Sequence, residues 1–194
     1  MENYKVNDGV GIIPEGTTVI ADDAFRDCTD LISIDIPASV KEIGSAAFLG
    51  CSSLKHITIP NTVTKIGLFA FAYCSELTEI SIPHSVRILM KGAFDSCSKL
   101  KSIVLPNNVT CLYEAICARC ASLTDVYLGK HIKDIKAWVF EDCTSLKHIY
   151  VHQGQVERIK DMLPEDLREL VVEQPREVVE QPGEDGEPPM FLYR

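Results

Sequence analysis

The sequence lacks several features that would point to particular classes of protein. It has no apolar run of about 18 residues, the length that a membrane span needs, so we expect no membrane insertion. Basic residues are in the minority, with 19 Lys and Arg against 28 Asp and Glu. Because binding to phosphates needs a basic face, the net charge of −9 argues against a nucleic-acid partner.

The N-terminal residues also lack the layout of an export signal. Residues 1–5 read Met-Glu-Asn-Tyr-Lys, without a charged segment followed by an apolar one. This favours an intracellular protein. The alternative is a cell-surface protein, which holds if the chain is part of a longer one.

What the sequence does have is a repeat, and its cysteines make the repeat visible. A cysteine recurs every 23 residues, at Cys28, Cys51, Cys74, Cys97, Cys120 and Cys143. A fixed period of this size indicates a solenoid, in which each repeat forms one coil. The continuous period argues for one domain, and 46% apolar residues are enough to fill its core.

Other residue types recur in the same phase. Three residues before each cysteine stand Phe25, Phe48, Phe71, Phe94, Cys117 and Phe140. In the segment Leu77–Pro83, apolar and polar residues alternate, which predicts a short strand with one buried face. Pro83 ends it, since proline has no N–H to donate. The Ala-Phe-x-x-Cys stretch predicts a short helical or 3₁₀ turn on the opposite side, and stacking would bury each column as a ladder.

The combined pattern, L-x-x-I-x-I-P-x-x-V-x-x-I-x-x-x-A-F-x-x-C, resembles the BspA-like (Treponema-type) leucine-rich repeat. The resemblance covers about six units over residues 10–151. It implies a right-handed solenoid with a parallel β-sheet on the concave face and short turns or 3₁₀ elements opposite. It also implies a module that binds proteins or surfaces, with no catalysis and no cofactor, and we expect a monomer.

The two ends of the chain depart from the repeat. Val156, Ile159 and Leu163 have helical spacing, which predicts a short amphipathic helix within a C-terminal cap near 152–172. Leu167, Leu170 and Val172 predict a last strand, so that the solenoid spans residues 1–172. Residues 173–194 are rich in Pro and Glu, and we expect this acidic tail to be disordered. Its apolar end, 190–194, is either a docking motif or a segment that folds back.

The cysteines could form a disulfide framework or could pack in the core. Equivalent residues of neighbouring coils would have their Cβ atoms about 4.8 Å apart, whereas a disulfide needs about 3.8 Å. We therefore favour packing, and unpaired thiols suit a reducing compartment.

Cys117 and Cys120, with Cys111 nearby, have a spacing that suits zinc or redox chemistry. Because Cys117 stands in the Phe column, we favour a volume exchange in which Ile116 fills its space.

The residues between the inward strand positions form two columns on the exposed sheet face. The first column is Ser33, His56, Glu79, Ser102, Asp125 and His148. The second column is Asp35, Thr58, Ser81, Val104, Tyr127 and Tyr150. A Ser102–Asp125–His148 catalytic triad is rejected, since the histidine of a triad lies between the other two residues.

The end of the second column is the strongest candidate for a binding site. Val104, Tyr127 and Tyr150 follow one another on successive coils, and tyrosine is enriched at interfaces. Asp125 and His148 would supply polar contacts at the rim. The alternative is that these tyrosines only favour β structure and stack on each other. The sequence thus predicts a non-catalytic module that binds a protein partner through the concave face, or alternatively an adhesin-like module for host or matrix ligands.

Overall fold

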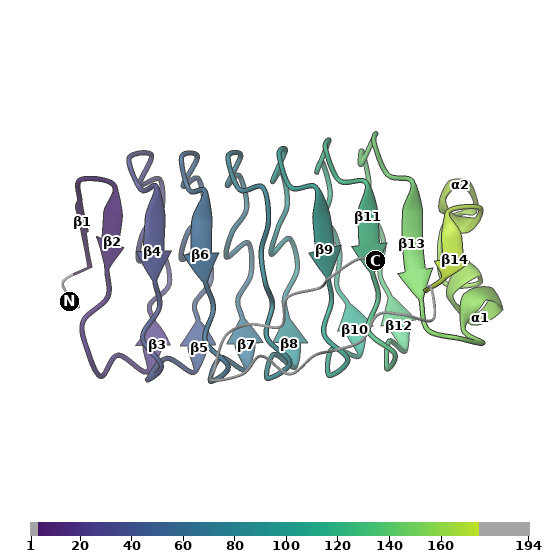
Figure 1. Ribbon diagram of the computed structural model, residues 1–194, viewed down its shortest axis with the longest axis horizontal. Coiled ribbons are helices and arrows are strands. Elements are labelled where there is room, and N and C mark those ends of the chain that lie inside the picture. The colour runs from purple at the N-terminus through teal and green to yellow at the C-terminus, as the bar shows by residue number, and fades with distance from the viewer. Residues whose placement is uncertain (1–3, 175–194) are drawn as a thin grey trace.

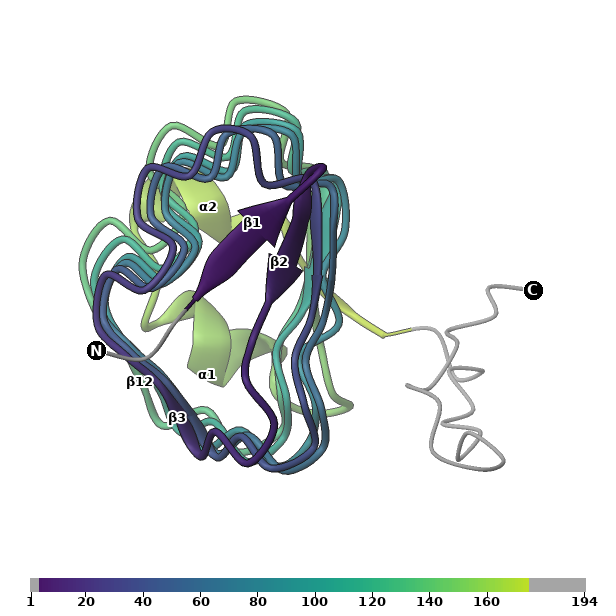
Figure 2. The ribbon, with the colours of Figure 1, turned by 90° about the vertical axis from the view of Figure 1, so that its left-hand side faces the viewer.

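The computed structural model describes residues 4–174, which form a parallel β-solenoid whose coils stack along one axis (Figures 1 and 2). The strands lie in two rows along the stack, drawn as an upper and a lower row in Figure 1. The upper row contains β2 (Val10–Ile12), β4 (Ser33–Asp35), β6 (His56–Thr58), β9 (Ser102–Val104), β11 (Asp125–Tyr127) and β13 (His148–Val151). The lower row contains β3 (Val19–Ile20), β5 (Glu42–Ile43), β7 (Lys65–Ile66), β8 (Ile88–Leu89), β10 (Cys111–Leu112) and β12 (Asp134–Ile135).

The register of the strands follows the sequence period. In the upper row Ser33 pairs with His56, and in the lower row Glu42 pairs with Lys65, each 23 residues further along the chain. This confirms that one repeat forms one coil of a parallel solenoid. The lower row was not predicted, because a two-residue strand such as β7 appears in the sequence only as one inward residue beside one outward residue.

The predicted strand at Leu77–Pro83 is wrong. The upper row divides into two four-stranded sheets, and between them only Thr58 and Ser81 form an isolated bridge. Ile80 and Ile82 are nevertheless buried, with 8% of their surface exposed. Inward packing therefore holds this coil in phase without a full ladder of backbone hydrogen bonds.

The Ala-Phe-x-x-Cys segments are hydrogen-bonded turns. The amide of Cys28, for example, donates to the carbonyl of Phe25 at 3.1 Å. Such a turn places two residues in the left-handed region, as at Phe69 (φ 52°) and Tyr73 (φ 61°), which is unfavourable for residues with a side chain. Their amides donate to carbonyls of the next coil, at 3.0 Å to Lys91 and 2.8 Å to Asp95, so stacking stabilises the turn.

Aromatic rings and thiols form two ladders inside the solenoid. Phe25, Phe48, Phe71 and Phe94 stack nearly parallel, with ring centroids 5.1–5.6 Å apart. All eight cysteines are free. The thiol of Cys51 donates to the carbonyl of Phe25 in the preceding coil at 3.0 Å, and the cysteines at 74, 97, 120 and 143 repeat this bond. Burial raises the pKa of Cys97 to about 12, so this thiol stays protonated at neutral pH.

The first coil is covered by an antiparallel hairpin. Strand β1 (Lys5–Asn7) pairs with β2, and the ring of Tyr4 lies 5.2 Å from that of Phe25. The hairpin therefore covers the end of the phenylalanine ladder, which would otherwise meet solvent.

The last coil is covered by a short cap. Helix α1 (Val156–Lys160) forms as predicted and buries Ile159, although Leu163 lies beyond its end. Helix α2 (Glu165–Arg168) was not predicted; it contains Leu167, which was expected in a strand. The last strand is β14 (Val171–Glu173), which pairs with β13 and turns Val171 inward instead of Val172. These differences from the predicted cap have one cause. The cap packs against the open end of the core, so its residues do not follow the spacing of the repeat. The acidic tail was expected to be disordered from residue 173 onward, but Glu173 belongs to β14. Residues 175–194, with the apolar end 190–194, lie outside the described part.

No helix among residues 4–174 is long and apolar enough to cross a membrane.

Candidate functional site

The candidate site lies on the outward side of three neighbouring strands. The register of β9, β11 and β13 aligns Val104 with Tyr127 and Tyr127 with Tyr150. In each of the three strands the preceding residue is buried. Because side chains alternate along a strand, Val104, Tyr127 and Tyr150 point to the surface. We call the surface formed by Val104, Asp125, Tyr127, His148 and Tyr150 the tyrosine face.

The aromatic side chains of this face contact one another. The rings of Tyr127 and Tyr150 stack with centroids 4.6 Å apart at an angle of 15°. The imidazole of His148 lies 5.3 Å from the ring of Tyr150, tilted by 33°. All three side chains remain half-exposed. They form a continuous surface that is partly apolar and already ordered.

A hydrogen-bonded pair lies beside the tyrosines. Nδ1 of His148 is 2.8 Å from one carboxylate oxygen of Asp125, and the hydroxyl of Thr124 donates to the other at 2.6 Å. Partial burial alone would raise the pKa of Asp125, but the hydrogen bonds from Thr124 and His148 outweigh it and lower that pKa below its ordinary value. Asp125 is thus held as a carboxylate that fixes the position of the His148 ring.

The same geometry argues against catalysis by these polar residues. Asp125 pairs with Ser102 on one side and with His148 on the other, so the acid lies in the middle. A nucleophilic serine needs the histidine as its neighbour, to accept the hydroxyl proton. The other histidine of this column, His56, lies on β6, four coils before His148, and is too far away to act together with it.

Of the cysteines with a metal-like spacing, Cys111 lies in a different element from the other two. Cys111 lies half-buried on β10 in the lower row, whereas Cys117 and Cys120 are fully buried in the turn that follows. Within residues 4–174, no three His, Cys, Asp or Glu side chains come close enough to hold a metal ion.

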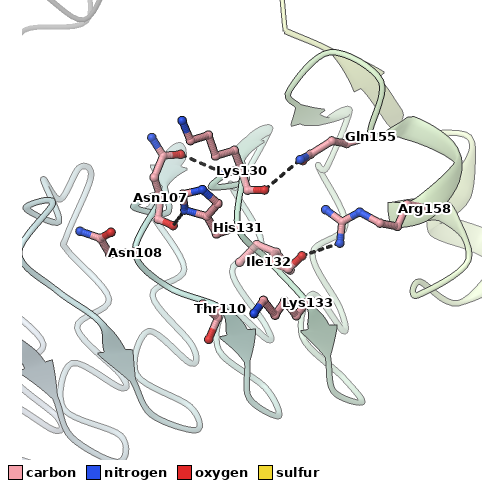
Figure 3. Close-up of a pocket in the computed structure, with 9 residues that line it drawn as sticks. All are labelled: Asn107, Asn108, Thr110, Lys130, His131, Ile132, Lys133, Gln155 and Arg158. Atoms are coloured by element: carbon pink, nitrogen blue, oxygen red, sulfur yellow. Dashed lines mark hydrogen bonds between the residues drawn. The ribbon is translucent and has the colours of Figure 1, made fainter.

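A second feature, a groove, was missed by the sequence reasoning. It lies where the coils turn from the upper to the lower row, and it continues to α1 (Figure 3). The residues that line it are Asn107, Asn108, Thr110, Lys130, His131, Ile132, Lys133, Gln155 and Arg158. The sequence contains one indication of this groove, the basic residues within 130–133. The residues across the groove could not be predicted from it, because they lie 23 and 25 residues away along the chain.

Comparison with known proteins agrees with this architecture. The family described as BspA type Leucine rich repeat region matches residues 18–147 in six copies. A leucine-rich repeat protein of T. pallidum (TpLRR) has a similar crystal structure, with a TM-score of 0.69 and 28% sequence identity. The match covers 77% of this chain and 81% of that one. No curated protein matches the sequence.

Two further solved structures are longer than this chain. A leucine-rich cell surface protein of Faecalibacterium prausnitzii matches with a TM-score of 0.57 and 27% identity, over 76% of this chain and 52% of that one. The pneumococcal vaccine antigen PcpA has a TM-score of 0.64 and 24% identity, over 89% of this chain and 46% of that one, and so shows the fold alone. The chain thus spans about half the length of both proteins.

Proposed function

Since the chain belongs to the BspA-type leucine-rich repeat family, we propose that it is a non-catalytic module that binds a protein partner through the tyrosine face. Family and fold support an interaction or surface module, and the tyrosine face is where this chain departs from a polar sheet surface. At the corresponding positions of earlier coils stand Asp35, Thr58 and Ser81.

The stacked tyrosine pair carries this proposal. Tyrosine gives a large apolar contact area with a polar tip, and it loses little conformational entropy on binding. Stacking at 4.6 Å further restricts both rings before a partner arrives. Half-exposed aromatic side chains in such a surface can each contribute about 2 kcal/mol or more to binding.

The Asp125–His148 pair supplies the polar rim. Asp125 is a fixed acceptor with its charge retained, and His148 holds an edge of the aromatic surface in place. A partner with an apolar or aromatic segment beside a basic or amide donor would match both parts. Complementarity of this kind contributes more to specificity than to affinity.

A surface ligand is the second candidate for the same face. The similar Faecalibacterium prausnitzii protein is a cell surface protein, and this favours a ligand outside the cell if the chain belongs to a longer, exported one. Locating the native protein by cell fractionation would separate the two candidates.

The test is a binding assay with matched variants. Tyr127→Ala with Tyr150→Ala should abolish partner capture, whereas Tyr127→Phe with Tyr150→Phe should retain most of it, because the rings stay stacked. The control, Thr58→Ala with Ser81→Ala, changes the same column on earlier coils and should bind normally. All three proteins should show the circular dichroism of the wild type. Unchanged capture by the alanine pair would contradict the tyrosine face as the binding site.

A further inference from the structure

The groove of Figure 3 is a cationic site on an acidic protein. Lys130, His131 and Lys133 come from the turn between β11 and β12, and Arg158 comes from α1. Among the described residues that line the groove there is no carboxylate. The whole chain carries a net charge of −9, so the charge of the groove is opposite in sign to that of the chain as a whole.

The walls of the groove are held by hydrogen bonds between coils. The backbone amide of Lys130 donates to the side-chain oxygen of Asn107 at 2.9 Å. Nδ1 of His131 lies 2.9 Å from the Asn107 carbonyl, which can only accept, so that nitrogen carries the proton. Gln155 donates to the carbonyl of Lys130 at 2.8 Å, and Arg158 donates to that of Ile132 at 2.5 Å. These contacts therefore hold the backbone of the groove wall in place.

Glycine allows the two turns of this wall to touch. A Cβ atom at Gly129 would lie 2.4 Å from the carbonyl oxygen of Pro106, which is too close for any side chain. The proline that stands in this position in the earlier repeats would therefore not fit here. The close approach brings the Lys130–Lys133 segment against Asn107.

The two lysines of the groove are not engaged in ion pairs in the described part of the chain. Elsewhere lysines are paired between coils, as Lys65 with Glu42 at 3.2 Å and Lys99 with Glu76 at 2.6 Å. Lys130 and Lys133 are exposed, and neither forms an ion pair within residues 4–174. They are thus available to carboxylates that approach from outside the coils.

An acidic segment of the chain begins next to this groove. The described part ends just after β14, where the Glu173 carboxylate accepts from the amide of Gly154 at 2.9 Å, beside Gln155 in the groove wall. The sequence that follows, 175–194, has five acidic residues and two arginines, a net charge of −3. An extended chain advances about 3.3 Å per residue and coils are about 4.8 Å apart, so a few residues suffice to reach the groove.

We propose that this groove is a docking site for a carboxylate-rich polypeptide, and that its occupant is the segment 175–194 of the same molecule. Charge complementarity and the short connection both favour this occupant. The segment needs no fold of its own, because the contacts are between carboxylates and cations. Contacts of this kind weaken as salt rises.

The experiment uses the full chain and backbone NMR at low ionic strength. A tail variant replaces the five acids by amides: Glu177→Gln, Glu180→Gln, Glu184→Gln, Asp185→Asn and Glu187→Gln. The amide signals of Lys130, His131, Lys133 and Gln155 should shift relative to the wild type, while those of β3 and β5 should not. At about 0.5 M salt the two spectra should converge around the groove.

A reciprocal pair of variants tests the groove itself. Lys130→Glu with Lys133→Glu should shift the amide signals of residues 175–194. Lys41→Glu with Arg87→Glu makes the same change of charge at the position of Lys133 in earlier coils and should leave these signals unchanged. Equal shifts in both pairs, or no response of the groove to the tail variant, would overturn the proposal. Shifts that grow with protein concentration would assign the groove to a second copy and would overturn it too.

Discussion

The earlier coils and the later coils of the solenoid differ in where their stacked aromatic rings lie. From Phe25 to Phe94 the rings stack inside, and the outward residues of the second column are Asp35, Thr58 and Ser81. In the later coils Cys117 interrupts the inner ladder, and the stacked pair Tyr127–Tyr150 lies outside.

This difference shows which positions the fold leaves free. An inward ring is surrounded by the rings of the coils before and after it, so its size and shape are fixed by packing. An outward residue faces solvent and other outward residues, so it can change from aspartate to tyrosine without altering the coil. The exposed column can therefore carry a specific interaction, while the buried columns carry the fold.

The largest expected effect is on the inner ladder. Phe71→Ala removes a fully buried ring that stacks on Phe48 and Phe94, and we expect it to lower the free energy of unfolding by about 3–5 kcal/mol. Chemical denaturation measures this directly. Ser81→Ala, on the outward side, should change stability by less than about 0.5 kcal/mol. Similar losses in both variants would remove the distinction between inner and outer columns.

At Cys117, where the ladder is interrupted, adding a ring should lower the stability, just as removing a ring does at Phe71. We expect Cys117→Phe, which adds a ring beside Ile116 at a fully buried position, to overpack the core and to destabilise the protein by about 1–3 kcal/mol. Adding Ile116→Ala, which restores the pattern of the earlier coils, should recover much of that loss. Thermal unfolding compares the two variants, and a higher melting temperature for Cys117→Phe alone would show that the site has unused volume.

The smallest expected change in stability concerns Asp125 in the polar rim of the tyrosine face. The pKa of Asp125 is lowered in the folded state, so its contribution to stability is present above the unfolded value of about 3.9 and is lost as the pH falls through the folded one. Asp125→Asn should therefore cost about 0.2–1 kcal/mol at pH 7 and almost nothing near pH 2. Urea unfolding at both pH values tests this.

The control for the polar rim is Glu79→Gln. It makes the same change of charge in the same column, and Glu79 forms no ion pair among the described residues, so stability should hardly change at either pH. A loss at pH 7 as large as that of Asp125→Asn would mean that the effect belongs to the column and not to the contacts of Asp125.

Much of the fold could be predicted from the repeat, because packing imposes the same residue types on each coil. The inward positions of the strands, such as Ile103, Val126 and Ile149, are buried as expected. The lower row of strands was missed, since two residues are too few to show alternation. The break at residues 79–81 was also missed, because the sequence there keeps the regular pattern while the backbone does not.

The polar contacts between coils were the least predictable part. Asp95 is buried, and its carboxylate is paired with Arg119 and hydrogen-bonded to Ser96, in a turn where sequence spacing alone gives no reason to join them. The groove has the same origin, because its walls come from two turns and a helix. Such contacts depend on side-chain conformations and on the distance between coils, and the residue pattern records neither.

The sequence by itself determined the 23-residue coil, the residues that face inward, and the column in which Val104, Tyr127 and Tyr150 follow one another, because each depends on spacing along the chain. The tertiary structure alone decided that His148 binds Asp125, that the two tyrosines stack, and that Lys130 and Lys133 line a groove beside the end of β14. These depend on how neighbouring coils approach each other, and this is set by the packing of the whole stack.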